Sequence, residues 1–369
     1  MKSEKKEHKF MKKAMMVLLV ALVAVGLIFA QGAQEGKTTE KIKIGALIRN
    51  LNETFVRDYT DNLYALAEKA GVEIYVQDAN SDVDKQISQL DTMISQGYKY
   101  FVIIPQDTSA TELMCEKINA VGGAAAFSNI QPSVDALKVG KNFFLASSPE
   151  QVAGQYQAEI AIEYFTKYPE KAPGKVINVL YINGQLGHPA QVNRRAGFVN
   201  TLEAKGWTVN FVAEDTANWG AEQAQQKMDA WVTAFDGKYN LVVAQNDDMA
   251  LGAIESLIQN GKVKADTSDG TRLLVPVLGV DATATGCASI DRDEMYATVL
   301  QDAIGQSTTA FEIVLNIAQG NSPDGFVAGG IAPATTTIDE EPANDPTIIS
   351  QCYLVPFKPV TKENYKDYM

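Results

Sequence analysis

The sequence predicts an α/β protein whose chain forms two doubly wound lobes, each built on a parallel sheet. Short runs rich in Val, Ile and Leu alternate with helix-like segments along most of the chain, and this alternation is typical of right-handed βαβ units. The expected strands form two similar series, which two sheets accommodate better than one. The chain of 369 residues also exceeds one typical hydrophobic core.

The expected elements follow one another in two series. The first has strands at 42–48, 72–78, 100–104, 123–127 and 142–145, and helices at 54–70, 84–96 and 109–121. The second has strands at 176–182, 208–213, 240–245, 273–280 and 295–300, and helices at 150–167, 188–205, 221–235 and 247–260. A helix at 302–318 comes next. It is followed by an irregular segment rich in Pro and Gly at 321–347 and by a last strand at 352–357.

The first thirty residues have the pattern of a secretory signal peptide. Several lysines precede an apolar run over 14–30, and small and polar residues follow it. We therefore assign residues 1–33 to a signal peptide and expect the mature protein outside the cytoplasm. An uncleaved membrane anchor is the alternative, but the apolar run is slightly short for a helix that spans a bilayer.

Composition argues against several classes of function. A formal net charge of −13 disfavours nucleic acid and anionic membrane surfaces as partners. Cys115, Cys287 and Cys352 lie among apolar or small residues, which favours core packing over disulfides or a metal site. A zinc site or a Ser-His-Asp triad would depend on His188, because the other histidine lies in the signal segment. No phosphate-binding loop or cluster of metal ligands is evident, so we expect neither enzyme, cofactor nor metal.

Polar side chains follow three of the expected strands. Asn183 follows the strand at 176–182, Asn246 and Asp247 follow the strand at 240–245, and Asp281 follows the apolar run at 273–280. In open α/β sheets ligands bind outside the carboxyl ends of the strands. Amides and carboxylates gathered there are suited to hydroxyl groups. The pattern predicts a crevice that receives a small polyol.

Several short segments resemble, in order and spacing, the ribose/galactose-type solute-binding proteins of ABC importers, and among them the periplasmic galactose/glucose-binding proteins. They are GHP at 187–189 with Arg194 on the same helix, DTANW at 215–219, KMDAW at 227–231, NDDMALGA at 246–253, PVLGVD at 276–281 and ATVLQD at 297–302. The looser resemblance extends over nearly the whole chain from Lys41.

The resemblance implies a type I periplasmic binding protein, in which three hinge crossings join two lobes around a sugar. The lobes would be 41–146 with 303–348, and 147–302 with 349–369. The implied ligand is a hexopyranose, glucose or galactose, and the alternative is a pentose such as xylose, or a nucleoside. Repressor cores share the fold, but they begin with a basic helix-turn-helix and bind DNA, which the acidity of this chain opposes.

The resemblance also implies which side chains contact the sugar. Asn129 would bind it from the first lobe, while Phe55 and Trp219 would stack on the two apolar faces of the ring. The remaining polar contacts would come from Glu53, His188, Arg194, Asn246, Asp281 and Gln301.

Local sequence leaves simpler interpretations open for some of these positions. His188 could begin a helix, Asn129 could form a turn, and the two aromatic residues could be core residues. For Asp247 we favour a helix N-cap.

The chain departs from the family pattern at several positions. Ala190 stands where the family has a carboxylate, Asn52-Glu53 replaces an aspartate, and Gln301 replaces an asparagine. Residues 168–175 lack the alternating oxygen ligands of the family's calcium loop, so we expect no structural calcium. Expected partners are an ABC permease in the inner membrane and, as a second candidate, a chemoreceptor. The protein itself is expected to be a periplasmic monomer.

Overall fold

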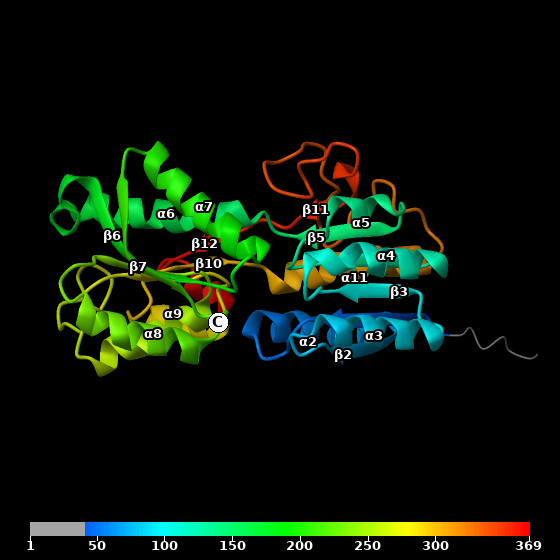
Figure 1. Ribbon diagram of the computed structural model, residues 1–369, viewed down its shortest axis with the longest axis horizontal. Helices are drawn as coiled ribbons and strands as arrows, with labels where there is room; N and C mark the ends of the chain where they lie inside the picture. Colours follow the sequence, from blue (N-terminus) through cyan, green and yellow to red (C-terminus); the bar gives the residue numbers. More distant parts are fainter. Residues whose placement is uncertain (1–40) are drawn as a thin grey trace, which may run out of the picture. The chain divides into compact units, whose positions relative to one another are not determined.

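The computed structural model describes residues 41–369, and the signal peptide expected at 1–33 lies outside these residues. The described chain has the expected α/β architecture, with one set of helices and strands for each lobe (Figure 1). Among the helices of residues 41–369, none is long and apolar enough to cross a membrane.

The first lobe is built on a six-stranded parallel sheet in the order β11-β5-β4-β3-β1-β2. These strands are β1 (Lys43–Ile48), β2 (Glu73–Asp78), β3 (Tyr100–Ile103), β4 (Ala124–Phe127), β5 (Phe143–Ser147) and β11 (Cys352–Leu354). One face is covered by α2 (Thr54–Ala70) and α11 (Ala303–Ala318). The other is covered by α3 (Val83–Ser95), α4 (Thr111–Ala120) and α5 (Val134–Lys138). Burial on both faces explains why the central strands are continuous apolar runs.

The second lobe is built on a four-stranded parallel sheet in the order β7-β6-β8-β9. Its strands are β6 (Val176–Asn183), β7 (Thr208–Thr216), β8 (Leu241–Ala244) and β9 (Val277–Leu278). One core cluster contains α6 (Glu150–Lys167) and α7 (Pro189–Ala204), and another contains α8 (Ala221–Ala234), α9 (Asp247–Gln259) and α10 (Ala284–Asp291). Single bridges extend this sheet from β9 to β10 (Thr298–Leu300), which pairs with antiparallel β12 (Lys358–Val360).

The long helices are confirmed with ends shifted by a residue or two, whereas two short helices, α5 and α10, were not expected. The strand expected at 273–280 is wrong in its extent, because only Val277–Leu278 joins the parallel sheet. Pro276 has no N–H to donate to a ladder. Leu273 instead forms an antiparallel bridge with Val263.

The last hinge crossing also differs from the prediction. The strand β11 pairs with β5 in parallel register, Cys352 with Leu145 and Leu354 with Ser147, and therefore belongs to the first lobe. Assigning all of 349–369 to the second lobe is thus wrong for residues 352–354. The chain crosses after Leu354 instead of before Cys352, because β12 is the next element of the second lobe.

The three cysteines are buried and unpaired, as the sequence predicts. Cys115 and Cys352 lie in the core of the first lobe, and Cys287 lies in that of the second. Trp207 is a core residue that packs against Phe165. These residues stabilise the lobes and take no part in the site described below.

Candidate ligand-binding site

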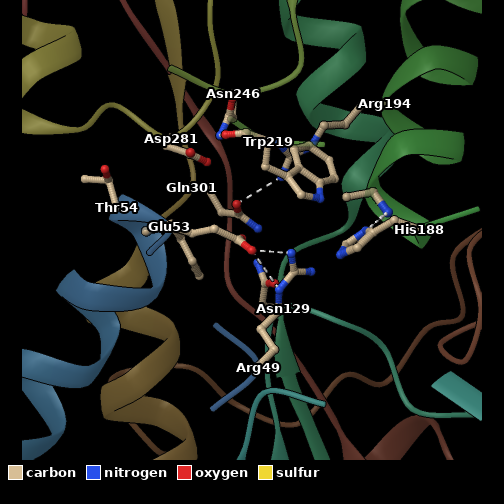
Figure 2. Close-up of a pocket in the computed structure, with 12 residues that line it drawn as sticks. Arg49, Glu53, Thr54, Asn129, His188, Arg194, Trp219, Asn246, Asp281 and Gln301 are labelled. Carbon is tan, nitrogen blue, oxygen red and sulfur yellow. Dashed lines mark hydrogen bonds and ion pairs between the residues drawn. The ribbon is translucent and has the colours of Figure 1, made fainter. Parts of the chain in front are cut away.

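One cavity is lined by residues of both lobes (Figure 2), and it brings together all nine residues that the family resemblance implies as sugar contacts. They are Glu53, Phe55, Asn129, His188, Arg194, Trp219, Asn246, Asp281 and Gln301. The cavity holds about 350 Å³ of empty space, a figure that includes its opening to solvent. Arg49, Thr54 and Ala190 complete the lining.

The first lobe contributes an ion pair and an aromatic ring. Arg49 directly follows β1, and its Nε donates to Oε1 of Glu53 at 3.1 Å. Burial raises the pKa of Glu53, although the nearby guanidinium of Arg49 opposes that shift. Phe55 lies in the first turn of α2 and is buried. Asn129 comes shortly after β4 and has a φ of 62°. Its backbone N–H donates to Oε1 of Gln306 on α11 at 3.3 Å.

Arg194 is the centre of the hydrogen-bond network in the second lobe. Its Nε donates to Oε2 of Glu150 at 2.7 Å, and its Nη2 donates to Oε1 of Gln301 at 2.9 Å. The Nε2 of Gln301 donates to the other oxygen of Glu150 at 3.0 Å. A third guanidinium nitrogen donates to the carbonyl of Gln245. Because all these groups are buried, the network holds the guanidinium in one orientation at the cavity.

His188 combines a structural role with a place in the site. It is the N-cap of α7, and its Nδ1 accepts a hydrogen bond from the N–H of Ala190 at 3.0 Å. Burial lowers the pKa of the imidazole well below its usual value, and the charges of Arg49 and Arg194 lower it further. The ring is therefore neutral at pH 7. Its proton is on Nε2, which makes that atom a hydrogen-bond donor.

Trp219 is held in place from several sides. Its ring stands edge-on to that of His188, with centroids 5.0 Å apart, and the guanidinium carbon of Arg194 lies 5.7 Å from its centroid. A Cβ on Gly184 would lie 2.1 Å from the indole, so only glycine fits beneath it. Within residues 41–369 the buried Nε1 of Trp219 has no acceptor. A donor is therefore available beside the cavity.

Asp281 has an unusual environment for a carboxylate. Its φ is 121°, and no side-chain or backbone donor of the described chain bonds its carboxylate. Burial raises its pKa well above the usual value. The guanidinium of Arg194 opposes this shift, and the carboxylates of Asp247 and Asp248 add to it. The N-cap of α10 is Thr283 and not Asp281.

Asn246 and Asp247, at the start of α9, have different roles. Asn246 caps α9 by accepting from the N–H of Met249 at 2.9 Å, and it donates to the carbonyl of Trp219 at 3.2 Å. The expectation that Asp247 is the N-cap is therefore wrong. Its buried carboxylate accepts from the N–H and Oγ1 of Thr283 and from Oγ1 of Thr298. These bonds tie α9 to the strand ends beside Asp281.

Some polar residues depart from the sequence-based picture. Asn183 ends β6 but does not line the cavity; it donates to Glu214 at 2.9 Å and accepts from Gln191 at 3.1 Å. Arg49 was missed, although it follows a parallel strand just as Asn246 and Asp281 do, so the same rule could have found it.

The described residues give no indication of a metal centre. Within 41–369, no group of three His, Cys, Asp or Glu side chains is arranged to hold a metal ion. Residues 168–175, where the family's calcium loop would lie, contain two 3₁₀ turns, Pro169–Lys171 and Pro173–Lys175.

Comparisons with known proteins agree with this architecture. The chain matches the family described as periplasmic binding protein domain over residues 44–322. It is 30% identical over 284 residues to a putative rhizopine-binding protein of Rhizobium meliloti, covering 76% of this chain and 82% of that protein. It is 26% identical over 277 residues to the D-galactose/methyl-galactoside binding periplasmic protein of Haemophilus influenzae, covering 72% of this chain and 80% of that protein.

A solved structure extends the agreement to three dimensions. It is an ABC transporter solute binding protein of Bacillus halodurans C-125 with bound myo-inositol. The TM-score is 0.69 at 25% identity, with 90% of this chain and 98% of that chain covered. The predicted type I fold is thereby confirmed, and the matching proteins are solute-binding proteins and not enzymes. This chain belongs to the periplasmic binding protein domain family.

Proposed function

We propose that this protein is the periplasmic sugar-binding component of an ABC importer and that it binds a hexopyranose, glucose or galactose, in the cavity between its lobes. The observation that carries the proposal is the convergence of nine side chains from both lobes on one small cavity. Two of them are aromatic, and the others carry amide, imidazole, guanidinium or carboxylate groups. A pyranose has apolar faces and a rim of hydroxyl groups, which this combination suits.

The polar groups of the cavity offer both donors and acceptors. Asp281 has a carboxylate without a partner in the described chain, so it can accept from two hydroxyl groups. His188 offers Nε2–H and Trp219 offers Nε1–H. Each hydroxyl can donate and accept, so a neutral polyol can satisfy both kinds of group at once. Both guanidinium groups that line the cavity already have a carboxylate partner, so among the described lining residues no unpaired cation is left for a phosphate or an acid sugar.

A related polyol is the second candidate. Curated relatives include a xylitol-binding protein of Mycolicibacterium smegmatis and a D-xylose-binding periplasmic protein of Escherichia coli. The structural relative from Bacillus halodurans holds myo-inositol. A pentose, a linear polyol or a cyclitol would use the same hydroxyl-directed groups. For partners we propose a membrane permease and, as a second candidate, a chemoreceptor.

A thermal-shift screen tests the proposal. It should include glucose, galactose, xylose, ribose, xylitol and myo-inositol. A ligand at a hundred times its Kd stabilises the folded protein by about 2.7 kcal/mol, which raises the Tm by a few degrees. We expect one or two of the six to produce this shift and to change the fluorescence of Trp219. Absence of any shift across the whole set would contradict the proposed function.

A further inference from the structure

The helix α2 begins beside the cavity without a side-chain cap from its own N-cap residue. That residue, Glu53, makes no capping hydrogen bond, because its carboxylate pairs with Arg49. The first turn of any helix leaves N–H groups without intrahelical partners. Here one of them finds a partner far away in the sequence. The N–H of Thr54 points to Oδ2 of Asp248 at 3.4 Å.

The hydroxyl of the same threonine strengthens this contact. Oγ1 of Thr54 lies 2.9 Å from Oδ1 and 3.0 Å from Oδ2 of Asp248. Thr54 is the first residue of α2 in the first lobe, and Asp248 lies in the first turn of α9 in the second lobe. A carboxylate at a helix N-terminus is favoured by the helix dipole as well as by the hydrogen bonds. One lobe thus caps a helix of the other.

The contact lies at the edge of the cavity and outside it. Thr54 is among the lining residues, whereas Asp248 is not. Asp248 therefore joins the lobes without a place among the groups that surround the ligand. Any opening of the lobes separates α2 from α9 and breaks these bonds. Asp248 and the first residues of α2 would then be exposed to solvent.

We propose that Asp248 and Thr54 form a clasp between the lobes, which stabilises the closed arrangement independently of the ligand and thereby raises ligand affinity. The inference rests on the proposed function as a two-lobe receptor. The apparent affinity of such a receptor is reduced by the fraction of molecules that are not in the binding-competent state. A contact that favours closure therefore increases affinity for every ligand by the same factor.

The charges around the clasp show why a partner for Asp248 matters. Burial raises the pKa of four neighbouring carboxyl groups, and the charge of Asp248 adds to each shift: Glu53 and Asp58 of the first lobe, and Asp247 and Asp281 of the second. Carboxylates from both lobes thus come together when the lobes meet, which opposes closure. Arg49 and Arg57 are the nearby cations of the first lobe; Arg57 donates to Thr54 at 2.9 Å, on the clasp itself. The hydrogen bonds from Thr54 offset the repulsion at this point.

Asp248→Ala is the informative variant, because it removes the clasp without removing a residue that lines the cavity. We expect its Kd for the best sugar of the screen to rise about tenfold, as for the loss of a charged helix cap. The rank order of the sugars should stay the same, since no contact to them is lost. Asp248→Asn keeps one acceptor for Thr54 and should lose less. Glu255→Ala removes an exposed carboxylate from the same helix and should bind as the unaltered protein does.

Single-molecule energy transfer between one dye on each lobe completes the test. In the sugar-free protein, Asp248→Ala should show a smaller closed fraction than the unaltered protein, and Glu255→Ala should not. This readout works even where no sugar binds, so failure of the proposed function and failure of the clasp can be told apart. An unchanged Kd or closed fraction in Asp248→Ala would overturn the clasp. A changed rank order of sugars would also overturn it, because Asp248 would then contact the ligand.

Discussion

At the scale of single residues, Asp281 of the proposed site has a cost in stability. Its carboxylate is buried at the cavity, and its raised pKa reflects the loss of solvation. A buried carboxylate without hydrogen-bond donors destabilises a protein. The same group becomes favourable once hydroxyl donors of a ligand reach it. Under the proposed function, Asp281 would accept hydrogen bonds from hydroxyl groups of the ligand.

Substitution of Asp281 should therefore separate affinity from stability. Hydrogen bonds to a charged group contribute about 1.5–3 kcal/mol each, so Asp281→Ala should weaken sugar binding by about ten- to a hundredfold. Asp281→Asn keeps one acceptor and should lose less. The Tm of the sugar-free variants should hold or rise, since Thr283 caps α10. Calorimetry beside thermal melts measures both quantities, and a normal Kd for Asp281→Ala would contradict the site.

At the scale of elements, the close packing of α6 against α7 positions Arg194. A Cβ on Gly154 would lie 1.8 Å from the carbonyl oxygen of Arg194, and a Cβ on Gly197 would lie 2.0 Å from that of Gln151. Two glycines thus let the helix backbones touch. This brings Arg194 of α7 within hydrogen-bonding distance of Glu150 at the start of α6.

Gly154→Ala should disturb the site through this helix pair. The extra methyl group meets backbone, which cannot turn away, so overpacking should cost about 1–3 kcal/mol of stability. We expect weaker sugar binding as well, because α7 must shift and carry Arg194 with it. Gln155→Ala is the control, since it shortens an exposed side chain next to Gly154 on the same helix. Urea unfolding measures the stability of both variants, and calorimetry measures their sugar affinity. If the control changes stability and affinity as much as Gly154→Ala does, the helix packing does not position Arg194 as described.

The irregular segment that precedes β11 also caps a helix of the other lobe. The N-cap of α6 is Pro149, which has no capping side chain. Glu340 supplies the cap, since its carboxylate accepts from the N–H groups of Glu150 and Gln151 at 2.9 and 3.0 Å. It also accepts from Gln131 at 3.1 Å. Burial raises the pKa of Glu340 to about 7, and the neighbouring carboxylate of Glu150 adds to the shift.

This shifted pKa predicts how stability depends on pH. The folded protein binds the proton of Glu340 more tightly than the unfolded chain does, so the stability that this group contributes is fully present below the unfolded pKa of 4.5. It falls as pH rises toward about 7 and then levels off. A shift of this size corresponds to at most about 3 kcal/mol. Glu340→Gln should lose this dependence. The free energy of unfolding of the variant should therefore rise, relative to that of the unaltered protein, between pH 5 and pH 8. Urea unfolding of both proteins at pH 5 and at pH 8 measures this change. If the two proteins differ in unfolding free energy by the same amount at both pH values, the prediction is contradicted.

At the scale of the whole molecule, the cavity takes residues from both lobes, so a ligand that contacts both should favour their closure. Chain segments join the lobes after β5, after β10 and after β11, where short stretches can absorb a hinge rotation. We expect small-angle scattering to show a smaller radius of gyration when the preferred sugar is added. An unchanged radius at saturation would count against hinge closure.

The sequence by itself determines the local structure and much of the site. Apolar runs and helical periodicity are properties of neighbouring residues, so the long helices and most strands are predictable. The site residues are also predictable, because the ends of parallel strands meet at one edge and the short motifs match a known family. Asn246 and Asp281 follow strands in this way. Their roles toward a ligand remain predictions.

Only the tertiary structure decided which distant segments pair. The strand β11 joins β5 across more than two hundred residues, and nothing in its local pattern selects one sheet over the other. Asp247 reaches Thr283 and Thr298, Asp248 reaches Thr54, and Glu340 reaches the start of α6. Each of these carboxylates would look like a solvated or capping residue in its own segment. Their partners are set by how the lobes and helices pack, because burial and hydrogen bonding depend on what lies nearby in space and not along the chain.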